Sequence, residues 1–98
     1  MPEASISGGP GPLALSGELT ADTVPQLYRT GRRAIEQGGA ALELDLAGVR
    51  RADSAGLALL IDWLAYARQR QCALRYTHLP ANLEALAGLS EVTALLRG

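Results

Sequence analysis

Apolar and polar residues alternate in short segments of the chain, and longer segments with a helical repeat lie between them. Residues 13–19 alternate between leucine or glycine and polar or small side chains, which is the two-residue period of a half-buried strand. The same period recurs at residues 42–46 and 72–77, and residues 3–6 are expected to add a short edge strand. The pattern predicts a sheet of four to five strands.

A first helix is predicted between the strands at 13–19 and 42–46. Either Thr20 or Asp22 is expected to cap it, Pro25 falls in its first turn, and the two glycines at 38–39 end it. Apolar residues recur at steps of three and four and give the helix one apolar face. They are Val24, Leu27, Tyr28, Gly31, Ala34 and Ile35.

Two more helices are predicted in the second half of the chain. Residues 47–53 are expected to form a loop that carries two arginines, and a long helix follows over residues 54–71. Pro80 opens a third helix, and Ser90 is expected to cap a final turn. Strands and helices therefore alternate, which predicts an α/β fold with a mainly parallel sheet.

The polarity of the strands predicts which face of the sheet is covered. Glu43 and Asp45 alternate with leucines, so the second face of their strand is expected to be exposed to water, with Arg75 facing one of these carboxylates. A sheet that is buried on both faces would instead have continuous apolar strands. The sequence thus predicts one domain over residues 1–98, with helices packed chiefly on one face of the sheet.

The long helix has two apolar sides at about 100° per residue. The side expected to meet the sheet carries Leu57, Leu60, Ile61 and Leu64. The opposite side carries Ala55, Leu59, Asp62, Trp63 and Tyr66. Because Trp63 and Tyr66 are typical interface residues, we expect this second side to be an exposed contact patch. The alternative is that another element, such as the C-terminal helix, covers it.

The segment 53–57 (DSAGL) carries the most specific chemistry, because it joins a strand to a helix N-terminus. Ser54 is expected to be the N-cap, and Asp53 places a negative charge where the helix dipole favours one. These residues either cap the helix only, or they present Ser54 as a hydroxyl for phosphorylation or partner binding. Arg50 and Arg51 are either a solvated pair or contacts for an acidic partner.

Composition excludes several classes of function. The net charge is −1, and all nine basic residues are arginines, so a domain that coats nucleic acid is not expected. One cysteine, Cys72, and one histidine, His78, argue against a disulfide or a metal site. We expect no cofactor and no enzymatic activity, because no paired catalytic groups are recognisable. The longest apolar run, interrupted by Asp62, is shorter than the roughly 20 residues that span a bilayer, which favours a soluble protein of a reducing compartment.

Two runs of the chain together resemble STAS domains, the family of anti-sigma-factor antagonists and sulfate-transporter tails. They are residues 44–49 (LDLAGV) and 53–57 (DSAGL), and the order of elements matches over nearly the whole chain. Residues 13–19 and 56–60 look most like the MlaB-type branch, the small STAS subunits of bacterial phospholipid-transport ABC complexes. The resemblance implies a non-enzymatic adaptor that binds the ATPase subunit of such a complex.

The resemblance also implies where the chain acts and with which residues. The complex would contain permease and lipid-binding subunits, and the chain would lie in the cytoplasm, peripheral to the inner membrane through its partner. The third helix, from Pro80, is a further part of the expected surface. The expected partner-binding residues are Arg51, Asp53, Ser54, Ala55, Leu59, Asp62, Trp63 and Tyr66.

One position departs from the pattern of the anti-sigma-factor antagonists. Those domains usually have Asp-Ser-Ser/Thr-Gly, and the second hydroxyl accepts the phosphate, whereas here that position is Ala55. This departure favours the transporter subunit. The alternative is an anti-sigma-factor antagonist that switches partners when it is phosphorylated, with Ser54 as the remaining acceptor.

Overall fold

The computed structural model of the chain describes residues 3–8 and 12–89. The elements follow one another as strand, strand, helix, strand, helix, strand and helix, which confirms the predicted order. They are β1 (Ala4–Ser7), β2 (Leu13–Leu19), α1 (Val24–Gln37), β3 (Ala41–Ala52), α2 (Ser54–Gln69), β4 (Ala73–Thr77) and α3 (Ala81–Leu89). The final turn expected from Ser90 lies outside the described residues.

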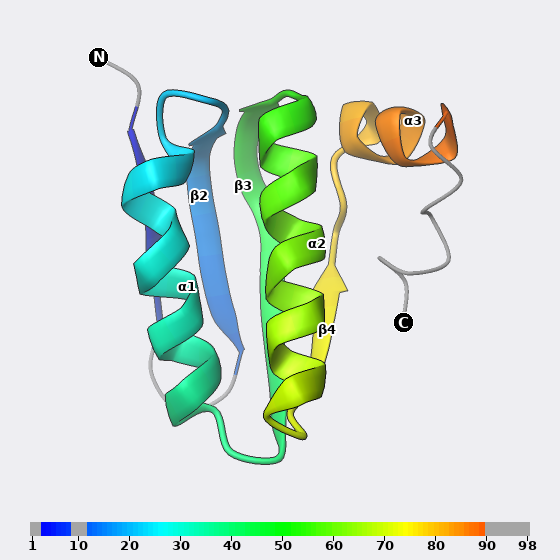
Figure 1. The fold of residues 1–98 in the computed structure, drawn as a ribbon. Coiled ribbons are helices and arrows are strands. Elements are labelled where there is room, and N and C mark those ends of the chain that lie inside the picture. Colours follow the sequence, from blue (N-terminus) through cyan, green and yellow to red (C-terminus); the bar gives the residue numbers. More distant parts are fainter. Residues whose placement is uncertain (1–2, 9–11, 90–98) are drawn as a thin grey trace.

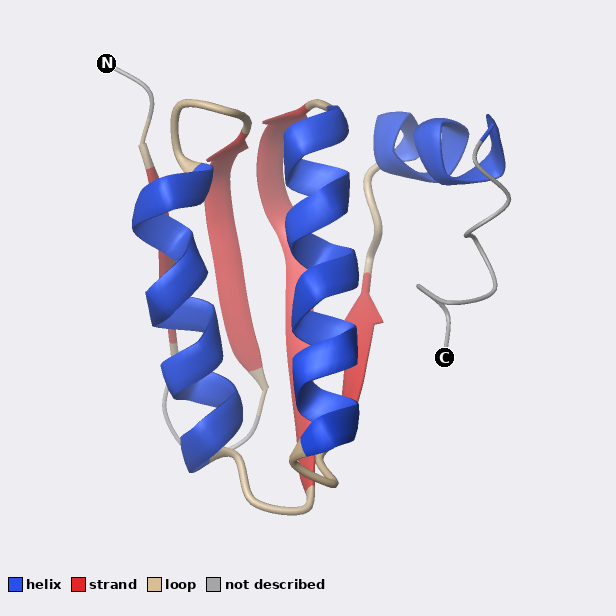
Figure 2. Ribbon diagram, in the orientation of Figure 1, coloured by secondary structure: helices blue, strands red, loops and turns tan. Residues whose placement is uncertain are grey.

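The strands of the described residues form one four-stranded sheet in the order β1-β2-β3-β4. β1 is antiparallel to β2, while the β2–β3 and β3–β4 pairs are parallel. Helices α1 and α2 lie side by side over one face of the sheet, and α3 lies past β4, beside the start of α2 (Figures 1 and 2). The mainly parallel α/β sheet with helices chiefly on one face is therefore confirmed.

The two faces of the sheet differ as the alternation of residues predicts. Leu15, Leu44 and Leu74 are buried, so they belong to the core. On β3 and β4, Glu43 lies opposite Arg75 in the register, as expected for the water-facing side. The next carboxylate along β3 contacts a histidine instead of Arg75: Asp45 Oδ1 lies 3.0 Å from Nδ1 of His78.

β3 is longer than the sequence pattern predicts. Residues 47–53 were expected to form a loop, but the strand continues to Ala52 and includes Arg50 and Arg51 near its end. Pairing continues because the β2–β3 register shifts twice, which accommodates extra residues in β3 as β-bulges do. Gly48 lies opposite Ser16, and a Cβ atom at Gly48 would approach the Ser16 Cβ to 2.8 Å. The close approach of the two strands at Gly48 explains why a glycine interrupts the strand pattern without ending the strand.

Helix α1 begins slightly later than predicted, because its N-cap is Thr23 rather than Thr20 or Asp22. The Thr23 hydroxyl donates to the Glu18 carbonyl at 2.7 Å and accepts from the Thr20 N–H at 3.1 Å. The Thr23 hydroxyl therefore stabilises the β2–α1 turn and makes no capping bond to the first turn of the helix. The apolar face is also narrower than predicted, since Tyr28 is 38% exposed.

Candidate functional site

The loop between β3 and α2 lies at the edge of the sheet where the three parallel strands end. Asp53 follows the last residue of β3 directly, and its N–H donates to the carbonyl of Leu19 at the end of β2, at 3.1 Å. From the third helix, the Asn82 side chain donates to the carbonyl of Ala52 at 2.8 Å. Hydrogen bonds therefore join the ends of two strands and the start of α3 around this loop.

Asp53, and not Ser54, is the N-cap of α2. Its Oδ1 atom accepts from the N–H groups of Ala55 at 3.0 Å and Gly56 at 3.1 Å. Its Oδ2 atom accepts from the N–H of Ala21 in the β2–α1 turn at 3.2 Å. The predicted cap at Ser54 is wrong by one residue, because the longer Asp53 side chain precedes the helix in extended backbone and reaches the free N–H groups of the first turn.

Because Asp53 caps the helix, the Ser54 side chain has no capping role among the described residues. Ser54 is the first residue of α2, its side chain is exposed, and its hydroxyl makes no hydrogen bond with a described residue. The surrounding surface is built from the three connections at this edge of the sheet. We call it the Ser54 edge, and it consists of Ala21, Asp22, Asp53, Ser54, Ala55 and Asn82.

Replacing Asp53 by Ala is expected to lower the free energy of unfolding by about 1–2 kcal/mol, because three backbone N–H groups lose their acceptor. Urea unfolding followed by circular dichroism measures this loss. Asp22→Ala is the matched control, since Asp22 is exposed and caps nothing in the described residues. Equal midpoints for the two variants would contradict the assigned cap.

The predicted contact patch on α2 is wrong for Leu59 and Trp63. Trp63 is 1% exposed and Leu59 is 3% exposed, so both belong to the core. The Trp63 indole N–H donates to the carbonyl of Tyr28 in α1 at 3.3 Å. The element that covers Trp63 is therefore α1. Of the residues predicted to meet the sheet, Leu57 and Leu60 are buried as expected.

Gly31 explains how α1 comes close enough to cover the indole ring. A Cβ atom at Gly31 would lie 2.1 Å from Trp63 Cε2, so only glycine fits opposite the ring. A glycine inside a helix costs roughly 0.5–1 kcal/mol relative to alanine, which calls for a reason in the packing. This glycine on the apolar face of α1 was the sequence signal for a large side chain packed against it.

Asp62 and Tyr66, also predicted to contact a partner, lie half-buried in the groove between α1 and α2. Asp62 binds Arg32 of α1 through an ion pair of 3.1 Å, which raises the pKa of the arginine. The Tyr66 hydroxyl donates to the carboxylate of Glu36, and this bond raises the pKa of the tyrosine. The two residues therefore brace the helices together, about 12–18 Å along α2 from Ser54 at 1.5 Å per residue.

The remaining predicted residues lie close to Ser54. Ala55 is half-buried in the first turn of α2, and Arg51 is exposed near the end of β3, opposite Glu18 of β2. The structure thus brings together Arg51, Asp53, Ser54 and Ala55, and it separates them from the members of the predicted patch further along α2. Sequence reasoning missed Asn82 and the backbone N–H of Ala21, which carry no motif of their own.

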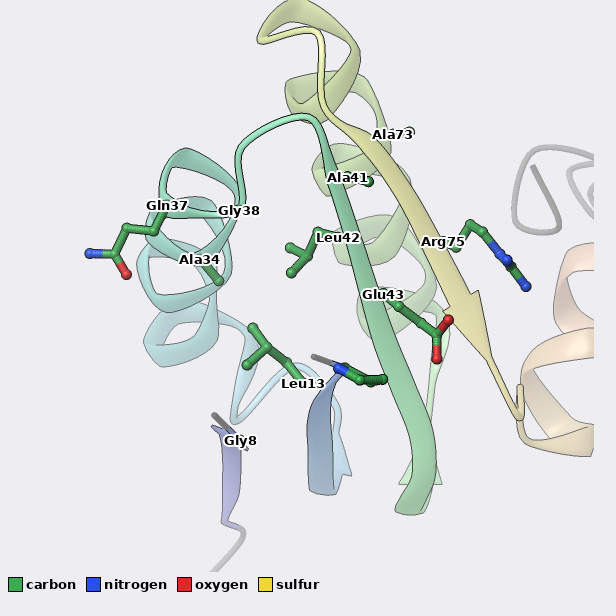
Figure 3. A pocket seen from close by; sticks show the side chains of 11 residues that line it. Gly8, Leu13, Ala34, Gln37, Gly38, Ala41, Leu42, Glu43, Ala73 and Arg75 are labelled. Atoms are coloured by element: carbon green, nitrogen blue, oxygen red, sulfur yellow. The ribbon is translucent and has the colours of Figure 1, made fainter. Parts of the chain in front are cut away.

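A cavity of about 730 Å³ lies at the opposite edge of the sheet, where the parallel strands begin. Figure 3 shows Leu42 pointing toward α1 there, while Arg75 points away from that helix. None of the predicted site residues is among the described residues that line this cavity. The cavity is therefore separate from the Ser54 edge.

The described residues contain neither a cluster suited to a metal ion nor a helix suited to span a membrane. No group of three or more His, Cys, Asp or Glu side chains in this part of the chain is placed to hold a metal ion. Within the same residues, no helix combines the length and the apolar character needed to cross a membrane.

Comparisons with known proteins agree on the fold. The family model described as "Mlab, STAS domain" matches residues 3–97. The unphosphorylated anti-sigma factor antagonist SpoIIAA is similar in structure, with a TM-score of 0.66 and 14% identity over 89% of this chain and 83% of that one. The phosphorylated form of SpoIIAA, a Bacillus cell fate determinant, gives a TM-score of 0.68 and 14% identity over 94% and 86% of the two chains. No curated protein matches this chain.

Proposed function

The chain belongs to the STAS domain family, and from that premise we propose that it is the STAS subunit of a phospholipid-transporting ABC complex. In this role it binds the ATPase subunit and supports the assembly or activity of the transporter, which maintains lipid asymmetry of the outer membrane. The chain itself catalyses no reaction and lies in the cytoplasm, at the inner membrane through its partner. The family model that matches the chain carries the MlaB description, which supports this branch of the family.

The observation that carries the proposal is the exposed Ser54 at the first position of α2, next to Ala55. Because Asp53 caps the helix, the Ser54 side chain is available to a partner. Ala21 and Ala55 on the Ser54 edge have small side chains, so the surface lets a partner approach the backbone closely there. The edge is fixed by hydrogen bonds from three connections, which limits the entropy that is lost when a partner binds.

One observation favours the second candidate, partner switching by phosphorylation. The hydroxyl of Ser54 is exposed at a helix N-terminus, where a phosphate group ordinarily finds backbone donors. Here the Asp53 carboxylate already accepts from the N–H groups of Ala55 and Gly56. A phosphate on Ser54 would meet that negative charge and filled donors, which disfavours Ser54 as a phosphate acceptor. Because Ala55 has no hydroxyl, the local chemistry supports the transporter subunit more than the switch.

The replacement Ser54→Arg is expected to reduce recovery of the ATPase subunit by about tenfold or more. A long charged side chain in the middle of the contact adds a steric clash and an unpaired charge. The measurement is co-purification of the tagged chain with the ATPase subunit expressed beside it, followed by quantification of the two bands.

Ser7→Arg is the matched control, because it makes the same change at an exposed position near the opposite edge of the sheet. This variant should recover the ATPase as the wild-type chain does. Both variants should keep the wild-type circular dichroism spectrum, since neither replaced side chain is buried. Normal recovery of the ATPase by folded Ser54→Arg protein would contradict the proposed site.

A further inference from the structure

An arginine lies between two tyrosine rings on the outer side of the α1–α2 groove. The guanidinium carbon of Arg32 is 4.6 Å from the centre of the Tyr28 ring and 4.2 Å from that of the Tyr66 ring. Its Nη2 atom lies 3.1 Å from Asp62 Oδ1, and the side chain is still 32% exposed. Cation–π contacts and the ion pair therefore hold both rings in place at the surface.

Three further arginines lie next to these residues, Arg29 and Arg33 in the chain and Arg70 in space. Arg29 and Arg33 are exposed on α1, one turn apart, and Arg70 stacks on the Tyr66 ring with 5.7 Å from its guanidinium carbon to the ring centre. No ion pair joins these three arginines to any described residue. We call this surface the arginine–tyrosine patch, and it consists of Tyr28, Arg29, Arg32, Arg33, Tyr66 and Arg70.

The patch is positively charged, because its four arginines outnumber the two carboxylates beside it. The only acidic residues of α1 and α2 are Glu36 and Asp62. The Glu36 carboxylate accepts from Tyr66, and Asp62 binds Arg32. The arginines of α1 also repel one another, since residues three and four positions apart are neighbours on a helix and like charges there are destabilising. An opposite charge from outside the chain would relieve this repulsion.

We propose that the arginine–tyrosine patch docks an acidic segment of a partner protein. Tyrosine rings held in place, with exposed arginines beside them, are the composition of energetically important interface residues. Arginine side chains pair bidentately with carboxylates, and Arg29 and Arg33 lie one helical turn apart. The fitting partner is therefore a helix with Asp or Glu side chains at a spacing of about four residues.

Two features favour a protein over an anionic membrane as the occupant. The chain contains no lysine, although basic surfaces that bind lipids use lysine as readily as arginine. Among the large apolar side chains of the described residues, Tyr28 is the one that is exposed, which gives a membrane little to bury. Recognition of carboxylates by shape fits the patch better than a diffuse attraction to lipid headgroups.

This surface is distinct from the Ser54 edge and goes beyond the proposed function. Tyr66 follows Ser54 by three turns of α2, which is about 18 Å at 1.5 Å per residue. A partner that binds the Ser54 edge therefore leaves the patch accessible on the outer side of the helices. The two surfaces are also tested separately, because Ser54→Arg should leave binding at the patch unchanged.

The test measures binding of a fluorescein-labelled, alanine-based helical peptide with glutamates at four-residue spacing, by fluorescence anisotropy. The double variant Arg29→Gln with Arg33→Gln should weaken binding about tenfold, since it removes two charge pairs with the peptide. Tyr28→Ala should weaken it by a similar factor. A peptide with glutamine in place of glutamate should not bind.

Arg50→Gln with Arg75→Gln is the matched control, because it removes two exposed positive charges from the strands. An equal loss of binding in this control would show that net charge alone explains the effect, and it would overturn the proposal. So would absence of peptide binding by the wild-type chain. If the double variant loses more of its binding to phosphatidylglycerol vesicles than of its binding to the peptide, the patch is a membrane-binding surface instead. Dimerisation that the double variant abolishes would assign it to a second copy of the chain.

Discussion

Replacing Trp63 by Ala is expected to lower the free energy of unfolding by about 3–5 kcal/mol, the range for removing a fully buried aromatic side chain. The indole ring fills the space between α1 and α2 and lies directly against Gly31. Because α1 touches the ring through its backbone, it has no side chain there to fill the cavity. The indole N–H bond to the Tyr28 carbonyl is lost as well.

Urea unfolding of the free domain measures this loss, and Tyr66→Phe is the control. That variant removes one hydroxyl and its bond to Glu36 at the surface of the same groove, so its unfolding midpoint should fall much less than that of Trp63→Ala. Gly31→Ala should also destabilise the domain, since the new methyl group would collide with the indole ring. A loss below about 1 kcal/mol for Trp63→Ala would mean that the ring is not packed in the core as described.

Replacing Gly56 by Ala is expected to destabilise the domain by about 1–3 kcal/mol or more and to disturb the Ser54 edge. A Cβ atom at Gly56 would lie 2.2 Å from the carbonyl oxygen of Leu19, at the end of β2. That oxygen already accepts from the N–H of Asp53, so it cannot move away without breaking the bond. The first turn of α2 must therefore shift, and Ser54 shifts with it.

Gly38→Ala is the control, because it adds the same methyl group at the end of α1 with nearest contacts of 3.2 Å. Its unfolding midpoint should stay close to that of the wild-type chain. Gly56→Ala should lose both stability and recovery of the ATPase subunit in the co-purification. Wild-type values for both would contradict the close contact between α2 and β2.

The order of elements and the polarity of the sheet were predictable because they depend on local patterns. Period-two alternation in β2 and β4 and the helical repeat of α1 each lie within one short segment. The full length of β3 was not predictable in this way, since its last residues, Arg51 and Ala52, pair with β2 only through shifts in register. Such shifts depend on the geometry of two strands that are far apart in sequence.

The candidate site, like the fold, was predictable from the sequence only in part. The segment that contains Asp53 and Ser54 was identified from its motif, although the cap proved to be Asp53. The prediction that Trp63 is exposed was wrong, because periodicity describes one helix and carries no information about a second helix beside it. The arginine–tyrosine patch was missed for the same reason, since it combines residues of α1 and α2 that only the packed structure brings together.

The central claim, that this STAS domain is the subunit of a phospholipid-transporting ABC complex, is tested most directly by native mass spectrometry. The tagged wild-type chain would be purified from the cells of its source, with the bound proteins identified from their peptides. We expect a complex with the ATPase subunit of an ABC transporter, in which Ser54 carries no phosphate. A complex with an anti-sigma kinase, or phosphorylated Ser54 in a chain without the ATPase subunit, would contradict the account.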